Sequence, residues 1–143
     1  MDPTARVIAV AGVVIALGSV GLNWFLFHLG GPRLKVRAFV RAESGAVHIE
    51  VAGAGRLTAT VRELELRDHL VIPSSSTISR WSLPVLPNGQ ALPRDLAPSA
   101  FLVAEVDVKQ VLAKAAGSQE VNVRAWCQRG DGKWYFSPVV RVR

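Results

Sequence analysis

The sequence predicts a mainly β protein: an immunoglobulin-like β-sandwich with one short helix, preceded by an N-terminal transmembrane α-helix. The segment 7–29 is apolar and contains no residue that is formally charged at neutral pH. Residues 34–143 repeatedly alternate apolar and polar side chains between turns rich in Gly and Pro, which is typical of about seven short strands. Cys127 is the single cysteine, so an intramolecular disulfide is impossible and the predicted domain depends on its apolar core.

Charge is distributed unevenly along the 143 residues. Lys and Arg number 17 against 11 Asp and Glu, a formal net charge of +6. Asp2 and Arg6 cancel before the apolar segment, so the whole excess lies after it. Such a balance fits an anionic membrane surface, an acidic partner or nucleic acid. The bases occur singly and never in a run, which favours a solvated surface.

The apolar segment has the length of a membrane span. Its 23 residues would form a helix of about 34 Å, against a hydrocarbon core of about 30 Å. Its last part holds aromatic residues typical of the headgroup interface, and Gly30, Gly31 and Pro32 are expected to end the helix. The predicted organisation is a short tail (1–6), a transmembrane helix (7–29), a linker (30–33) and a β-sandwich-like domain (34–143).

Three alternatives to a membrane span are a cleavable signal peptide, a buried core helix and a helix packed among its own copies in an assembly. The first needs a shorter apolar core, and the second is usually amphipathic.

Arg33, Lys35, Arg37 and Arg41 follow the helix, whereas only Arg6 and the α-amino group precede it. The positive-inside rule therefore favours a single-pass protein of the cell membrane with its domain in the cytoplasm.

Small residues recur inside this helix at spacings of three and four. Such a stripe lets helices approach closely in lipid, and Ser and Asn can hydrogen-bond across the contact. The alternative is that Gly and Ala are simply common in such helices. The stripe predicts a homo-oligomer formed through the helix, and consists of Ala9, Gly12, Ala16, Ser19 and Asn23.

The elements of the domain follow from local patterns. Alternation predicts strands at 34–41, 46–51 and 57–66, and a change of phase in the third predicts a β-bulge near Arg62 or Glu63. Short strands are expected at 70–72 and 78–83 around a loop at 73–76, then a Pro-punctuated extended segment and a strand at 100–106. Asp107 is placed as the N-cap of a helix at 108–116, with Gln110 in capping-box position. The last predicted unit is a hairpin with strands at 121–128 and 133–142 around a turn at 129–132.

Several short sequences resemble those of uncharacterised bacterial proteins, chiefly actinobacterial. They are the segment 31–36 after a helix carrying Asn23–Trp24, the segment 53–56, the step Leu96–Ala97–Pro98 and the segment 130–133. Those proteins pair one N-terminal membrane helix with a β-sandwich-like domain. The resemblance implies this architecture, but no activity and no functional residue.

The sequence predicts no catalytic residue, no metal site and no cofactor. His48 falls on the outward phase of its strand and His69 follows Asp68, so both are expected at the surface. Cys127 shares a strand face with apolar residues, which predicts an inert core thiol. Glu63 and Glu65 are expected on an exposed charged face rather than as a catalytic pair.

The final hairpin carries the most informative side chains. Trp126 and Trp134 flank its turn and lie close in sequence to Arg124, Arg129 and Lys133. One interpretation is an aromatic and basic surface for a partner, and the other is ordinary packing. Nucleic acid is not the expected partner. The sequence therefore predicts a non-enzymatic, membrane-tethered module that binds an unknown protein, the alternative being a structural component of a larger assembly with the apolar helix buried against protein.

Overall fold

The computed structural model describes residues 2–71, 77–78 and 81–143, and the chain divides into two compact units that meet at Gly31 and Pro32. The first unit is a single helix, α1 (Pro3–Gly30). It begins before residue 7 because the Asp2 carboxylate accepts a hydrogen bond from the backbone N–H of Thr4 at 3.1 Å, and proline suits the first turn. No residue of α1 is buried, and the predicted segment 7–29 lies within it.

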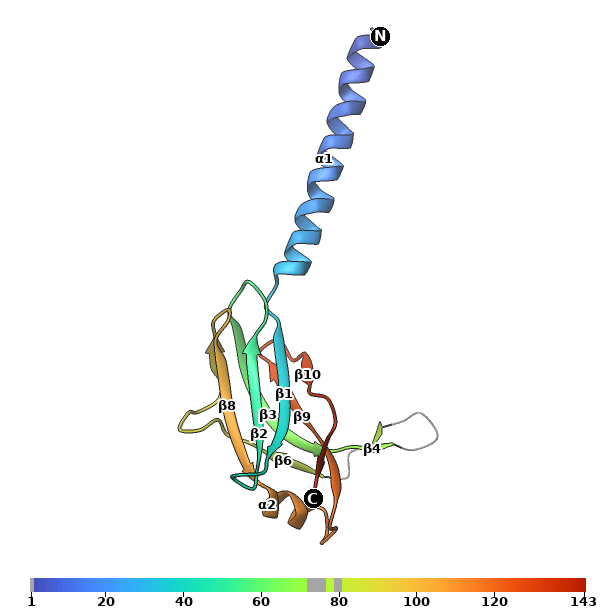
Figure 1. Cartoon of the computed structure of the whole chain (residues 1–143). Helices are drawn as coiled ribbons and strands as arrows, with labels where there is room; N and C mark the ends of the chain where they lie inside the picture. Colours follow the sequence, from blue (N-terminus) through green and yellow to red (C-terminus); the bar gives the residue numbers. More distant parts are fainter. Residues whose placement is uncertain (1, 72–76, 79–80) are drawn as a thin grey trace. The chain divides into compact units, whose positions relative to one another are not determined.

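The smaller sheet of the second unit has three antiparallel strands in the order β1-β2-β8 (Figure 1). The prediction at 34–41 is confirmed by β1 (Leu34–Arg41). The predictions at 46–51 and 100–106 are confirmed by β2 (Ala46–Gly53) and β8 (Phe101–Asp107), within two residues at each end. In β1 apolar inward residues alternate with an exposed row of three bases and Phe39, so one face of the strand packs inward and the other meets solvent.

The larger sheet is antiparallel with the order β10-β9-β3-β6, and two short strands add to it. Its central strands are β3 (Ala59–Asp68) and β9 (Val121–Arg129), flanked by β6 (Ser82–Pro84) and β10 (Trp134–Phe136). The pairing of β3 with β9 shifts register between Val61 and Glu63, which confirms the predicted β-bulge. The two additions are β11 (Val140–Val142) on β9 and β7 (Arg94–Leu96) on β3.

The expected return strand at 133–142 is interrupted between β10 and β11. Ser137 occupies the break, where its backbone N–H donates to the Ala125 carbonyl at 2.9 Å and its hydroxyl accepts from the Ala125 N–H at 3.0 Å. Pro138 follows and has no N–H to continue the ladder. The hairpin is therefore held across the break by one buried side chain.

The segment between β3 and β6 includes a two-stranded sheet of β4 (Leu70–Val71) and β5 (Thr77–Ile78). The predicted loop at 73–76 and part of the strands predicted at 70–72 and 78–83 lie outside the described residues.

The second helix, α2 (Val108–Lys114), is shorter than the predicted 108–116. Asp107 caps it as predicted, accepting from the Lys109 N–H at 2.8 Å. The helix ends early because Ala116 and Gly117 have φ angles of 56° and 79°, in the left-handed region.

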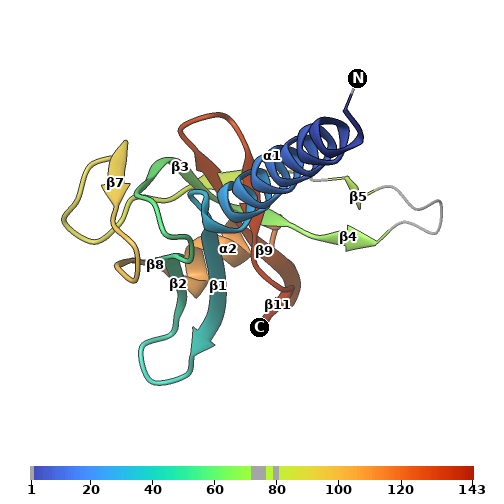
Figure 2. The same ribbon diagram turned by 90° about the horizontal axis from the view of Figure 1, so that it is seen from above.

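The two sheets share one apolar core. Figure 2 views the domain from above, with β1 and β2 on one side and β9 on the other. Inward residues of both sheets are buried, and Cys127 lies among them with no exposed surface. The largest fully buried side chains of this core include Ile49, Leu66, Val47, Val51, Val61, Val111, Val123 and Val142.

Candidate functional site

The outward face of the larger sheet gathers aromatic rings and guanidinium groups. Strand pairing places Trp126 of β9 opposite Glu65 of β3 and Phe136 of β10. Trp134 lies two pairs further along, opposite Gln128. Because side chains at alternate positions share a face, these residues project away from the core in which Cys127 is buried.

The rings and cations on this face contact one another in series. The guanidinium of Arg67 lies 5.0 Å from the Trp126 ring centroid and 4.7 Å from that of Trp134. The Arg124 guanidinium lies 4.6 Å from the Phe136 centroid, and the Trp126 and Phe136 centroids are 5.0 Å apart. These distances are within the range of cation–π and aromatic contacts. We call this surface the cation–aromatic face, which consists of Arg67, Arg124, Trp126, Trp134 and Phe136.

One cation of this face also has an anionic partner. The Arg67 Nε donates to the Glu65 carboxylate at 2.8 Å, and both side chains are largely shielded from solvent. Phe136 is the most exposed ring, with 53% of its surface accessible. The face therefore combines an internally stabilised centre with an exposed aromatic edge.

Arg129 and Lys133 lie elsewhere on the hairpin. Arg129 has the inward phase of β9, and its guanidinium donates to the Tyr135 hydroxyl at 3.0 Å and to the carbonyl of Pro32. The Lys133 ammonium lies 5.6 Å from the Tyr135 ring centroid. The four hairpin residues singled out from the sequence thus separate into two pairs, with Trp126 and Trp134 on the cation–aromatic face and Arg129 and Lys133 around Tyr135.

Asp131 completes the group around Arg129. Its carboxylate pairs with the Arg129 guanidinium and accepts from the Lys133 N–H at 3.1 Å. The hydrogen bond from Arg129 holds the pKa of the Asp131 carboxyl well below its usual range, and the same bond raises the pKa of Arg129. The Arg129 guanidinium and the Asp131 carboxylate therefore both carry their charges at neutral pH.

Two members of the cation–aromatic face, Arg67 and Phe136, were not predicted from the sequence. Arg67 is 59 positions before Trp126, and only the register of β3 against β9 brings the two together. Arg124 was predicted beside Trp126, because the period-two alternation of 121–128 places both on one face of the strand.

The expectation that His48 lies at the surface is wrong, because only 5% of it is exposed. It does have the outward phase of β2, but Phe39 covers it with ring centroids 4.8 Å apart. Its Nδ1 lies 3.2 Å from Glu105 and its Nε2 lies 3.3 Å from Glu50. The carboxylates lie at opposite ring nitrogens, and among the described residues no three His, Cys, Asp or Glu side chains are grouped to hold a metal ion.

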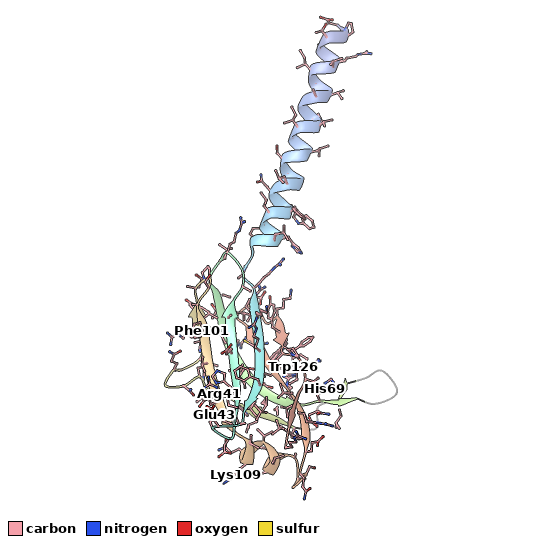
Figure 3. The ribbon with its side chains drawn as sticks, in the orientation of Figure 1. Arg41, Glu43, His69, Phe101, Lys109 and Trp126 are labelled. Atoms are coloured by element: carbon pink, nitrogen blue, oxygen red, sulfur yellow. The ribbon has the colours of Figure 1, made fainter. Side chains whose placement is uncertain are left out.

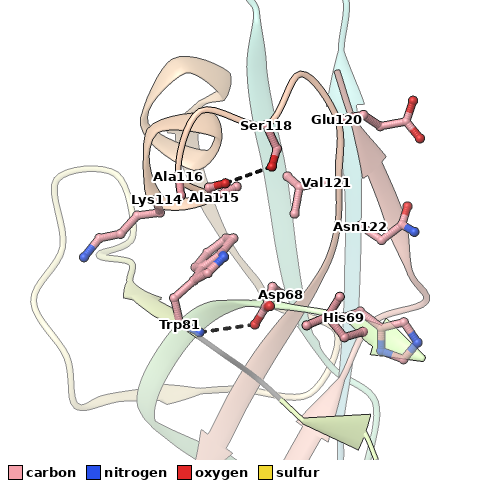
Figure 4. Close-up of a pocket in the computed structure, with 11 residues that line it drawn as sticks. Asp68, His69, Trp81, Lys114, Ala115, Ala116, Ser118, Glu120, Val121 and Asn122 are labelled. Atoms are coloured by element: carbon pink, nitrogen blue, oxygen red, sulfur yellow. Dashed lines mark hydrogen bonds between the residues drawn. The ribbon is translucent and has the colours of Figure 1, made fainter. Parts of the chain in front are cut away.

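A cleft of about 450 Å³ lies between the end of β3, the start of β9 and the turn after α2 (Figure 4). Asp68 forms its buried acidic wall and accepts from the Trp81 N–H at 3.3 Å. Lys114, Glu120 and Asn122 line it from the other elements, and His69, half-buried rather than exposed, lies beside Asp68. Its lining mixes both signs of charge and indicates no particular ligand.

The remaining residues singled out from the sequence lie in α1 and the core. The small-residue stripe follows one face of α1, and the Ser19 hydroxyl donates to the Ile15 carbonyl of its own helix at 2.9 Å. Burial raises the pKa of the Cys127 thiol to about 12. Glu63 is exposed, and Glu65 is engaged by Arg67.

Comparisons with known proteins give no family assignment. No family model matches, and no curated protein matches. Among solved structures, the ligand-binding region of serine-glutamate repeat protein A of Enterococcus faecium has a TM-score of 0.32 at 9% identity, covering 73% of this chain and 88% of that chain. The putative ApaA protein of Bordetella pertussis has a TM-score of 0.35 at 10% identity (78% and 88% covered). A superoxide reductase in the oxidised state has a TM-score of 0.33 at 10% identity (78% and 86% covered). TM-scores this low do not support any transfer of function.

Proposed function

We propose that the chain is a single-pass membrane protein in which α1 spans the bilayer and tethers a β domain that binds a partner. The observation that carries the proposal is α1 itself, which is 28 residues long, contains an 18-residue stretch with a mean hydropathy of 2.1 and has no buried residue. Fourteen large apolar side chains between Val7 and Leu29 are exposed in the isolated chain. At about 1.5–3 kcal/mol each, leaving these side chains in water would cost on the order of 20–40 kcal/mol, so an apolar environment must surround them. The hydrocarbon core of a bilayer is an apolar environment whose thickness a helix of this length matches.

We further propose that the β domain is an immunoglobulin-like sandwich. The strand orders β1-β2-β8 and β10-β9-β3-β6 support this, since the chain crosses between the two sheets after β2, β7 and β8. The connection after β8 passes through α2. Such crossovers are typical of Greek-key sandwiches.

The proposed side for this domain is the cytoplasm. Arg33, Lys35, Arg37 and Arg41 follow the helix, and basic residues next to a span are retained on the cytoplasmic side.

The domain is proposed to be a non-enzymatic binding module that uses the cation–aromatic face. Phe136 is exposed and lies beneath the Arg124 guanidinium. This combination suits contact with a protein surface, because aromatic and Arg side chains are enriched among the residues that contribute most to binding free energy at interfaces. Two reactive side chains are already engaged, since Cys127 is buried and Asp131 is paired with Arg129.

Membrane insertion and sidedness are tested together on the full chain expressed in bacteria. The untreated chain is expected to stay with membranes during alkaline carbonate extraction, and a variant with Val13→Arg and Leu17→Arg is expected to be released. Single cysteines at Thr4→Cys and Glu43→Cys then report topology, because both sites are exposed whereas native Cys127 is buried. In intact spheroplasts an impermeant maleimide should label only Thr4→Cys. Release of the untreated chain would refute the span, and labelling of only Glu43→Cys would reverse the proposed side.

Partner binding is tested by proximity labelling of the full chain in its native membranes. The double variant Trp134→Ala, Phe136→Ala should lose the neighbours that the unmodified chain recovers. Leu86→Ala is the matched control, because Leu86 is a large exposed apolar residue outside the face, with 70% of its surface accessible. An unchanged set of neighbours for the double variant would exclude the face as the binding surface.

A further inference from the structure

The end of the β domain that receives the chain from α1 has an unusual surface. We call it the linker end, and it consists of residues 33–35, 54–58, 97–101 and 129–133. Backbone hydrogen bonds hold these segments together: Ala54 N–H donates to the Arg33 carbonyl and Gly53 N–H to the Ala100 carbonyl, both at 2.9 Å. Arg129 reaches the carbonyl of Pro32 from the hairpin turn.

The linker end is strongly basic. Its four segments hold five bases, Arg33, Lys35, Arg56, Arg129 and Lys133, and a single acid, Asp131. Asp131 is paired with Arg129 and does not offset the charges of Lys35, Arg56 and Lys133. The opposite end differs: residues 41–46 and 107–120 hold three bases and three acids. The charge asymmetry is therefore a feature of position within the domain and not of overall composition.

Two large apolar side chains stand among these bases. Leu57 is 49% exposed in the loop between β2 and β3, and Phe101 is 67% exposed at the start of β8. Phe101 pairs with Ala52, whose other neighbour is Lys35 of β1, so base and ring share one row of the smaller sheet. Figure 3 labels Phe101 toward this end, with Glu43 and Lys109 at the opposite end. Exposed apolar tips within a basic surface are the composition of proteins that settle on anionic headgroups.

The connector between α1 and β1 is short. Only Gly31, Pro32 and Arg33 separate Gly30 from Leu34, and three residues reach about 10 Å at most. Screening in physiological salt also acts over about 8–10 Å. A bilayer that holds α1 thus brings its headgroups within electrostatic range of the linker end.

We propose that the linker end docks on the anionic phospholipid headgroups of the leaflet in which α1 ends, with Leu57 and Phe101 entering the headgroup layer and Lys35, Arg56 and Lys133 binding phosphate. This inference rests on the proposed membrane span. It adds a second function for the domain: a lipid-dependent restraint on how freely the tethered module moves over the membrane. An acidic protein or a nucleic acid fits the charge but has no comparable reason to be within reach.

The test uses the full chain reconstituted in nanodiscs of phosphatidylcholine alone or with 30% phosphatidylglycerol. A polarity-sensitive fluorophore on Leu57→Cys is expected to shift to the blue, and to be quenched by headgroup-spin-labelled lipid, only in the anionic discs. The same fluorophore on Glu43→Cys should respond to neither composition.

Charge reversal supplies the matched comparison. In the triple variant Lys35→Glu, Arg56→Glu, Lys133→Glu, the ratio of docked to undocked domain should fall by roughly a hundredfold, because each base contributes about fivefold. The variant Lys109→Glu, Lys114→Glu, Arg143→Glu makes the same change in net charge away from the linker end and should retain the blue shift.

Three outcomes would overturn the inference: no response of the Leu57→Cys probe to anionic lipid, the same response at Glu43→Cys, or equal loss in both reversal variants. Carbonate resistance is measured on the same preparations. A chain that resists extraction yet shows one of these outcomes refutes docking alone, whereas an extractable chain refutes the span and docking together.

Discussion

Arg67 is the residue on which the cation–aromatic face depends most. Its guanidinium contacts both Trp126 and Trp134 and is also paired with Glu65. Arg67→Ala should lower the free energy of unfolding by about 1–2 kcal/mol, since two cation–π contacts and a shielded ion pair are lost. The measurement is denaturant unfolding followed by tryptophan fluorescence, which these two rings report directly.

Arg37→Ala is the matched control for that measurement, because Arg37 is an exposed base on the outward face of β1. It should change stability by less than about 0.5 kcal/mol. Equal effects of the two substitutions would show that the cation–aromatic contacts contribute nothing specific.

Cys127 gives a prediction about reactivity. Burial raises the pKa of its thiol to about 12, and the thiolate is the form that reacts with maleimides. In the folded chain at pH 8, Cys127 should remain unlabelled for hours and become labelled within minutes in denaturant. Because the thiol has a higher pKa in the folded chain than in the unfolded chain, its contribution to folding stability is complete below pH 8 and is lost as the pH rises toward 12. Prompt labelling of the folded chain would place the thiol outside the core.

Single residues differ in how far their sequence predicts their surroundings. Period-two alternation alone predicts Cys127 as a core residue, because its neighbours at 123 and 125 are apolar. His48 obeys the same alternation and points away from the core, yet it is buried beneath Phe39 and between two carboxylates. Glu105, which helps to bury His48, is 57 positions away in the sequence. A local alternation pattern cannot predict a contact between residues so far apart in the chain.

At the scale of elements, the stripe on α1 makes a prediction about self-association. A Cβ added at Gly12 or at Gly18 meets no atom within 4 Å, so neither Gly12→Leu nor Gly18→Leu disturbs the helix by itself. Gly12 lies on the stripe and Gly18 does not. Gly12→Leu should therefore reduce helix association several-fold in a membrane reporter assay, and Gly18→Leu should leave it unchanged. The stripe has no role in association if the two variants give the same signal.

Gly53 at the end of β2 is required by close packing. A Cβ there would lie 2.5 Å from the Ala97 carbonyl oxygen, a backbone atom that cannot rotate away. Gly53→Ala should lower the midpoint of thermal unfolding of the β domain, at a cost of about 1–3 kcal/mol. An unchanged midpoint would mean that segment 97–100 shifts freely.

The longer elements were predictable because their signals are local. The strand β1 coincides with the alternating run that predicts it, and the phase change in β3 marks its bulge. The strand β7 was missed, since its three residues follow Pro93 and become a strand only by pairing with β3, more than thirty positions earlier. The break at Ser137 was missed for a related reason, as its hydroxyl replaces a ladder bond with Ala125.

At the scale of the whole molecule, the sequence separates an apolar helix from a mainly β domain, and the structure has the same division at Gly31. The packing of the two sheets around one core follows from the inward residues of both. The composition of the cation–aromatic face and of the linker end did not follow from the sequence, because each is assembled from segments that only the sheet order brings together.

The central claim is that lipid covers α1, and a nitroxide scan along the helix in liposomes tests it most directly. Single labels replace Val7, Val10, Val14, Leu17, Gly21 and Phe25, and collision rates with oxygen and with a water-soluble nickel complex are compared. The account predicts that the ratio of oxygen to nickel access is greatest near the middle of the helix and falls toward both ends. Low access for both reagents at every position, as for a helix enclosed by protein, would contradict it, and so would high nickel access throughout.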